Sequence, residues 1–219
     1  MTMIKSVRPS EIESQSFAII EKEFEAQTGL RSSQIDPDYF QVIRRVIHAT
    51  GDFDFGHSLI FGNRPIEAAI ESIRSGRDIY IDVSMGAAGI NARIIEQFGG
   101  RVKCHINDDD IAVNARKAGK TRTETALEKL SGSDVGIIAV GNAPTALIAA
   151  ITLISEGTID PALVVGVPVG FVNAVESKEL LTRQHCPFIT NKGRKGGTPV
   201  AVAIVNALLR LASRTADQD

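Results

Sequence analysis

The chain has 219 residues and a formal net charge of −2, with 43% hydrophobic and 23% charged residues. This composition is typical of a globular protein with a sizeable core, and it excludes an overall positive charge that would attract nucleic acid or a membrane surface. Residues 1–10 lack the apolar segment of a secretory signal, and Cys104 and Cys186 form no closely spaced pair, so a reduced, cytoplasmic protein is expected.

The first third of the chain, residues 1–76, is predicted to be helical. Ser10 and Glu13 have the spacing of a capping box at the start of a first helix. Asp36 followed by Pro37 is typical of an N-cap and the first position of a second helix. Apolar residues then recur at helical spacing, and glycines are expected to end each helix. The predicted helices are 10–28, 36–50 and 65–75.

Beyond residue 76, short apolar runs alternate with helical patterns. Runs that are apolar throughout indicate strands buried on both faces, and the alternation favours a parallel sheet covered by helices on both sides. The predicted strands are 78–84, 101–106, 135–140, 162–167 and 187–190. The predicted helices are about 88–98, 110–130 (as one helix or two), 144–155, 172–183 and 199–212. We therefore expect one domain, 1–219, with helices in 1–76 and a three-layer, doubly wound, flavodoxin-like unit with a five-stranded parallel sheet in 77–213.

One uncharged stretch, Val135–Ser155, is about as long as a membrane span. The segment Gly141-Asn142-Ala143-Pro144 interrupts it, which favours a strand, a tight loop and a helix. No membrane association is therefore expected.

Several common signatures of function are excluded. Gly119-Lys120-Thr121 resembles the end of a phosphate-binding loop, but position 114 holds asparagine in place of the first glycine. No dinucleotide-binding glycine motif or nucleophile elbow is present, and the four histidines lack metal-ligand spacing. The run Asp108–Asp110 is interpreted as a solvated loop that caps the next helix rather than as a cation site. No metal is predicted.

His48 falls in the last turn of the second predicted helix. The partial negative charge of a helix C-terminus favours a protonated ring. Asp52 and Asp54 are expected to act in the same direction, whereas Arg45, one turn earlier, opposes them. The position predicts a histidine that donates a proton near neutral pH. On spacing alone, a histidine that only complements the helix dipole is the favoured interpretation.

Other polar residues are candidates for ligand binding. Ser16 lies on the apolar ridge of the first helix, where the alternative is a hydroxyl that bonds back to a helix carbonyl. The loop 192–198 contains three cations, among them Arg194, and suits carboxylates or phosphates, although a solvated surface loop has the same composition. Arg122 in a weaker basic segment and Asn142 after an apolar strand are further candidates.

Taken in order along the chain, seven segments resemble the precorrin-8X methylmutases, also called precorrin isomerases. Each segment is short, but the ordered set is specific and covers nearly all of the chain beyond residue 15. The segments are SFAII at 16–20, HATGD at 48–52, GKTR at 119–122, GNAPTAL at 141–147, GVPVGFV at 166–172, AVESK at 174–178 and GRKGG at 193–197.

The resemblance implies a homodimeric, flavodoxin-like isomerase of cobalamin biosynthesis. Such an enzyme moves a methyl group between adjacent ring C carbons of precorrin-8X or cobalt-precorrin-8, giving hydrogenobyrinate or cobyrinate. The family's catalytic histidine falls on His48, and its substrate contacts fall on Ser16 and Arg45. The resemblance implies neither a metal nor an organic cofactor.

A corrin precursor is a broad apolar ring rimmed by acetate and propionate groups, and its methyl shift can follow protonation of the ring. It needs an acid and an apolar slot with basic edges. We expect Val46, Ile47 and Phe53 to form part of the wall. Two other functions are compatible with parts of the sequence: a tetrapyrrole-binding protein without catalysis, and a nucleotide-binding flavodoxin-like module, although the latter lacks phosphate-loop glycines.

Overall fold

In residues 8–216, which the computed structural model describes, six strands form a single mixed sheet with the order β1-β6-β5-β4-β2-β3. Strands β2 to β6 pair in parallel with their neighbours, and β1 pairs with β6 in the antiparallel sense. The strands are β1 Leu59–Gly62, β2 Asp78–Ile81, β3 Val102–Lys103, β4 Val135–Val140, β5 Leu163–Gly166 and β6 Phe188–Asn191.

The five predicted strands are present as β2 to β6, but the prediction of a purely parallel, five-stranded sheet is wrong. Strand β1 was missed at the sheet edge, where it pairs antiparallel to β6. It has four residues, all half-buried, and follows a short helix without a clear break in the sequence pattern. So short a run shows neither the continuous burial nor the alternation by which strands are detected.

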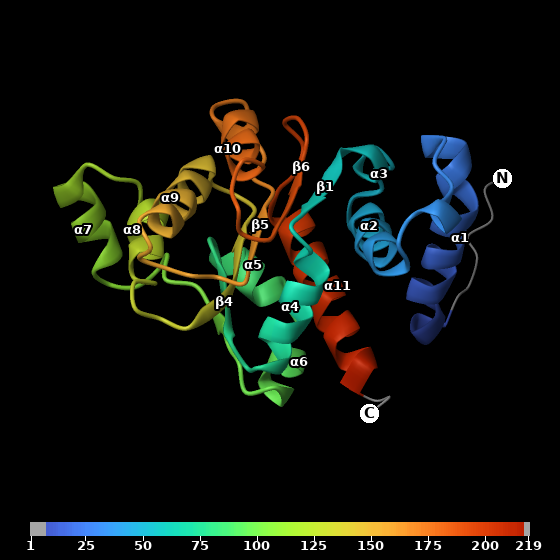
Figure 1. Ribbon diagram of the computed structural model, residues 1–219, viewed down its shortest axis with the longest axis horizontal. Helices are drawn as coiled ribbons and strands as arrows, with labels where there is room; N and C mark the ends of the chain where they lie inside the picture. The colour runs from blue at the N-terminus through green and yellow to red at the C-terminus, as the bar shows by residue number, and fades with distance from the viewer. Residues whose placement is uncertain (1–7, 217–219) are drawn as a thin grey trace.

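The helices cover both faces of the sheet, as Figure 1 shows. One core lies between the sheet and a group that includes α4, α6 and α11, and a second core lies between the other face and α8, α9 and α10. Residues of β4 alternate between the two cores, as expected for a strand buried on both sides. The helices are α1 Ile12–Thr28, α2 Pro37–Thr50, α3 Phe55–Ser58, α4 Pro65–Arg74, α5 Ser84–Gly89, α6 Ala92–Gln97, α7 Ile111–Ala118, α8 Arg122–Glu128, α9 Pro144–Ser155, α10 Ala174–Leu181 and α11 Thr198–Ala216, with short 3-10 turns at Pro9–Glu11 and Ser32–Gln34.

The N-terminal helices add a further layer beside the sheet. Helix α2 packs extensively against α11, and α1 packs against α2 on the side away from the sheet (Figure 1). The uncharged stretch 135–155 divides into β4 and α9, as predicted, with Pro144 at the start of the helix. Within residues 8–216, no helix is long and apolar enough to cross a membrane.

The two N-terminal helices begin differently from one another. Asp36 caps α2 as predicted, because its Oδ1 accepts the backbone N–H groups of Asp38 and Tyr39 at 2.9 and 3.3 Å. The capping box predicted for α1 is wrong: a 3-10 turn precedes Ile12, and no side chain caps the helix. The carboxylate of Glu13 instead binds arginines of two other helices.

The cap of α2 is a testable determinant of stability. Asp36→Ala should lower the free energy of unfolding by about 1 kcal/mol, because two backbone amides lose their acceptor. Urea denaturation followed by circular dichroism measures this change. Asp109→Ala, in an exposed loop, is the control and should have little effect; equal losses in both variants would contradict the assignment.

Candidate active site

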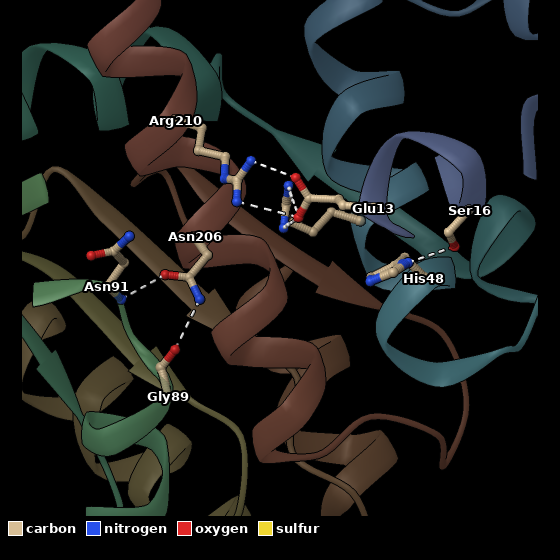
Figure 2. A network of polar contacts seen from close by, with 8 residues as sticks. Glu13, Ser16, His48, Gly89, Asn91, Asn206 and Arg210 are labelled. Carbon is tan, nitrogen blue, oxygen red and sulfur yellow. Dashed lines mark hydrogen bonds and ion pairs between the residues drawn. The ribbon is translucent and has the colours of Figure 1, made fainter. Parts of the chain in front are cut away.

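His48 lies at the C-terminal end of α2 and contacts Ser16 on α1. The Ser16 Oγ atom is 2.7 Å from the His48 Nδ1 atom, and Figure 2 shows the two side chains facing each other between the helices. Ser16 is half-buried and His48 is exposed. The Ser16 hydroxyl thus contacts an imidazole on another helix. The alternative for Ser16 was a hydrogen bond back to a carbonyl of its own helix. Because a hydroxyl both donates and accepts, this contact suits the neutral and the protonated ring alike.

Phe17 orients the histidine from one side. Its ring meets the His48 ring edge-on, with centroids 5.4 Å apart and an interplanar angle of 80°. The guanidinium groups of Arg44 and Arg45 lie 4.3 and 5.1 Å from the centroid of the same Phe17 ring. Phe17 therefore contacts both His48 and the basic residues one turn earlier on α2. The residue pattern did not predict a site role for Phe17, because an aromatic residue on an amphipathic helix is usually part of the core.

Arg45 belongs to an ion-pair network that joins three helices. Both terminal nitrogens of Arg45 donate to Glu13 Oε1, at 3.1 and 3.2 Å, and Arg210 on α11 donates to the same carboxylate at 2.7 and 3.2 Å (Figure 2). Partial burial raises the pKa of Glu13, but the hydrogen bonds and charges of the two arginines outweigh it, so the pKa lies below its ordinary value. Burial lowers the pKa of the Arg45 guanidinium. Residue spacing within one helix gives no signal for such a network.

Asp52 and Asp54, in the turn after α2, pair with a lysine. Each accepts a hydrogen bond from Lys195 Nζ at 2.6 Å, so the single ammonium balances one of their two negative charges. Burial raises the pKa of Asp52, but the hydrogen bond from Lys195 prevails and holds it below the ordinary value. The expectation that both carboxylates favour the protonated ring of His48 stays a prediction. Their contact with Lys195 also ties the 192–195 loop to the turn that follows α2.

The other predicted binding residues lie at the carboxyl ends of the parallel strands. Arg122 donates from Nη2 to the backbone oxygen of Ile106 at 2.7 Å and to Asn107 Oδ1 at 3.2 Å. The Arg194 guanidinium lies 5.3 Å from the Phe171 ring centroid, and both side chains are exposed. Asn142 is exposed directly after β4. Within residues 8–216, hydrogen bonds and ring contacts join His48 to Ser16 and Phe17, but not to Arg122, Asn142 or Arg194.

A buried carboxylate holds the loop that carries Asn142. Asp82, fully buried after β2, accepts the backbone N–H groups of Gly141, Asn142 and Ala143 at 3.1, 2.9 and 3.0 Å. Burial raises the pKa of Asp82, and these three hydrogen bonds counteract part of the shift. An aspartate directly after an apolar strand was the available signal in the sequence, and it was not used.

Two cavities border the histidine region. A hollow of about 290 Å³ is lined by Ser16, Phe53 and the apolar side chains of α1, including Ile12 and Ile19. Phe53 lines this hollow, and its place on the wall of a substrate slot stays a prediction. Val46 and Ile47 are 0% and 1% exposed and pack in the core, so their predicted place on such a wall is wrong. A second cavity of about 270 Å³ is lined by Phe17 together with Arg44, Arg45, Arg210 and Arg214.

The fold and this site define an α/β protein with a paired serine and histidine between two N-terminal helices, beside a cavity rich in arginines. The family model for precorrin-8X methylmutase matches residues 11–211. The chain therefore belongs to the precorrin-8X methylmutase family, the isomerases that act in cobalamin biosynthesis, and it is an isomerase.

Individual relatives agree with this assignment over nearly their whole length. A cobalt-precorrin-8 methylmutase of Priestia megaterium is 43% identical over 208 residues, covering 94% of this chain and 90% of the relative. A precorrin-8X methylmutase of Pseudomonas aeruginosa is 37% identical, covering 94% and 98%. The crystal structure of a precorrin-8X methylmutase from Thermus thermophilus superposes with a TM-score of 0.83 at 37% identity, covering 94% and 97%.

The Glu13 network generates a prediction on pH-dependent stability. The Glu13 side chain is 39% exposed, so solvent screens its pairs and Glu13→Gln should cost only about 1 kcal/mol at pH 7. The folded-state pKa of Glu13 lies below the ordinary 4.5, so the stabilisation is present above that pH and is lost as the pH falls through the folded-state pKa. Urea denaturation from pH 7 to pH 3 should show that the difference in free energy of unfolding between Glu13→Gln and the wild type decreases. Glu96→Gln, at an exposed residue on α6, is the control. A difference that does not depend on pH would contradict the ion-pair explanation.

Proposed function

We propose that the chain moves a methyl group between adjacent ring C carbons of precorrin-8X or cobalt-precorrin-8, giving hydrogenobyrinate or cobyrinate, with His48 as proton donor and acceptor. The names of the relatives support this substrate class. The observation that carries the catalytic role is the 2.7 Å contact between Ser16 Oγ and His48 Nδ1. It orients the ring and leaves the Nε2 atom for the substrate, because Nε2 has no hydrogen-bond partner among residues 8–216.

The serine matches the proton chemistry that this reaction requires. When His48 is protonated, its Nδ1–H donates to Ser16 Oγ and Nε2–H donates a proton to the conjugated ring. Protonation weakens the bond that holds the methyl group, which moves to the adjacent carbon. The neutral imidazole retains its Nδ1–H bond to Ser16, and its bare Nε2 then takes a proton back from the substrate. The proton is returned, so the net reaction is an isomerisation.

Basic and polar residues supply the proposed contacts to the substrate's carboxylates. Arg45 lies beside the histidine, and Arg122, Asn142 and Arg194 lie at the carboxyl ends of the strands, where α/β folds bind ligands. Guanidinium groups bind carboxylates with two parallel hydrogen bonds. The 192–195 loop contributes Arg194 and is held beside the turn after α2 by Lys195.

The size of the site supports a homodimeric assembly. The hollow beside Ser16 is about 290 Å³, small for a corrin ring, and its wall leaves Ile12 and Ile19 54% and 56% exposed. We infer a two-fold homodimer in which the partner subunit covers α1 and closes the slot.

The whole chain acts as one domain, since its first core contains residues from both 1–76 and 77–213. The order β3-β2-β4-β5-β6 supports the flavodoxin-like classification, and two free cysteines support a cytoplasmic location.

Removal of the acid tests the mechanism. His48→Ala should lower kcat by about a hundredfold or more while product still binds, because the slot survives. Ser16→Ala should cause a smaller loss and change the pH dependence of kcat. Visible absorbance with metal-free and cobalt-bearing substrate follows turnover and shows which form is used. His57→Ala, an exposed histidine on α3, is the matched control; a near-normal rate in His48→Ala would refute the role.

The basic rim is tested separately by binding. Arg45→Ala, and to a smaller extent Arg194→Ala, should weaken product binding, because charge-assisted hydrogen bonds to carboxylates are lost. Added salt should reduce the contribution of exposed Arg194 more than that of half-buried Arg45. Fluorescence or absorbance titration with product measures both effects. Arg93→Ala on α6 should bind normally, and unchanged affinity in both rim variants would exclude the proposed contacts.

The homodimer is tested by light scattering coupled to size-exclusion chromatography. The wild-type chain should have twice the monomer mass at micromolar concentration. Ile19→Asp should shift the equilibrium towards monomer and reduce product affinity, since a carboxylate is placed on the proposed interface. A monomeric wild type would contradict the proposal, and so would a variant that stays fully dimeric.

A further inference from the structure

Lys178 on α10 is a buried cation that has no carboxylate partner among residues 8–216. The residue as a whole is 2% exposed. The Nζ atom donates to the backbone oxygen of Lys195 at 2.8 Å and to Asn191 Oδ1 at 3.3 Å, both uncharged acceptors. No carboxylate among residues 8–216 forms an ion pair with it. A lysine is rarely buried in this way, because an unpaired ammonium loses its hydration without compensation.

A cavity of about 340 Å³ adjoins this ammonium. Ile60 of β1 and Val175 of α10 give it an apolar wall, and Lys178 and Lys192 give it two cations. The carboxylate of Glu179 also lines it and offsets one of the two charges. Lys178 has three N–H donors. Within the described part of the chain, Asn191 and Lys195 accept two of them, so one is left for a group in the cavity.

We propose that this cavity binds the carboxylate of a short aliphatic chain, with Lys178 as the principal partner. The carboxylate would form a charge-assisted hydrogen bond with the third Lys178 N–H and would provide the missing counter-charge. The methylene groups would contact Ile60 and Val175. Burial lowers the pKa of Lys178 to about 8, so the ammonium form still predominates at neutral pH. A cavity of this volume accommodates a carboxyethyl group, not a large ring.

The position of the cavity suggests one source of this carboxylate. The loop 191–195 separates it from the histidine region: the Lys195 backbone oxygen binds Lys178, and the Lys195 ammonium binds Asp52 and Asp54. If the proposed function holds, the ligand is a propionate side chain of the tetrapyrrole reaching past this loop. A free short-chain acid offers the same chemistry, and the experiment below distinguishes the two.

Direct titration tests the site without measuring turnover. Sodium propionate should shift the amide NMR signals of Asn191 and Gly193 at constant ionic strength, whereas uncharged propionamide should not. Lys178→Met should weaken propionate binding at least about tenfold, because the only buried cation of the cavity is lost. Glu179→Gln should strengthen binding, since one like charge is removed. Lys117→Met, an exposed lysine on α7, is the control and should bind like the wild type.

Competition with product then identifies the source. If propionate displaces product, or if Lys178→Met weakens product binding, the carboxylate belongs to the tetrapyrrole; if both ligands bind together, the site takes a free acid. Equal shifts with propionate and propionamide, or no shift in the wild type, would overturn the proposal. If Lys178→Met does not fold, the comparison of propionate with propionamide on the wild type decides whether the cavity binds a carboxylate. Loss of turnover in His48→Ala tests the proposed function independently.

Discussion

The packing of α1 on α2, and of α2 on α11, is the constraint on which the site depends. It brings Ser16 to within 2.7 Å of His48, and it brings Glu13 between arginines of two other helices. Buried apolar residues of α1 and α2, such as Phe24 and Val46, share one core with α11 and the sheet. The free energy that holds the serine and histidine together is therefore mainly that of apolar burial, to which the exposed contact between them adds little.

Around this core, charges connect segments that are remote in the sequence. The Glu13 carboxylate joins α1, α2 and α11, and Lys195 joins the last loop of the sheet to the turn after α2. Both sets of contacts place charged side chains near His48. The buried Lys178 extends the second set into the protein, because its ammonium donates a hydrogen bond to the Lys195 backbone oxygen. A ligand that bridges the histidine and the strand ends would contact both networks at once.

The candidate site residues lie on two different parts of the fold. The strand ends present Arg122, Asn142 and Arg194, whereas His48 lies on the added helical layer beside the sheet. Within one subunit, no hydrogen bond or ring contact among residues 8–216 joins the two groups. A flat, wide substrate, or a second subunit, is the kind of molecule that can contact both groups of residues.

The sequence by itself determined most of the elements: the five parallel strands, the cap at Asp36, and a histidine in the last turn of a helix. These follow from local rules of period, capping and helix polarity, and motif order adds the family. Tertiary structure decided what depends on contacts between distant residues. Glu13 binds arginines instead of capping its helix, Val46 and Ile47 face the core, Asp52 and Asp54 bind Lys195, and a four-residue strand closes the sheet edge. Charge pairing and burial are set by three-dimensional proximity, which residue spacing along one element does not encode.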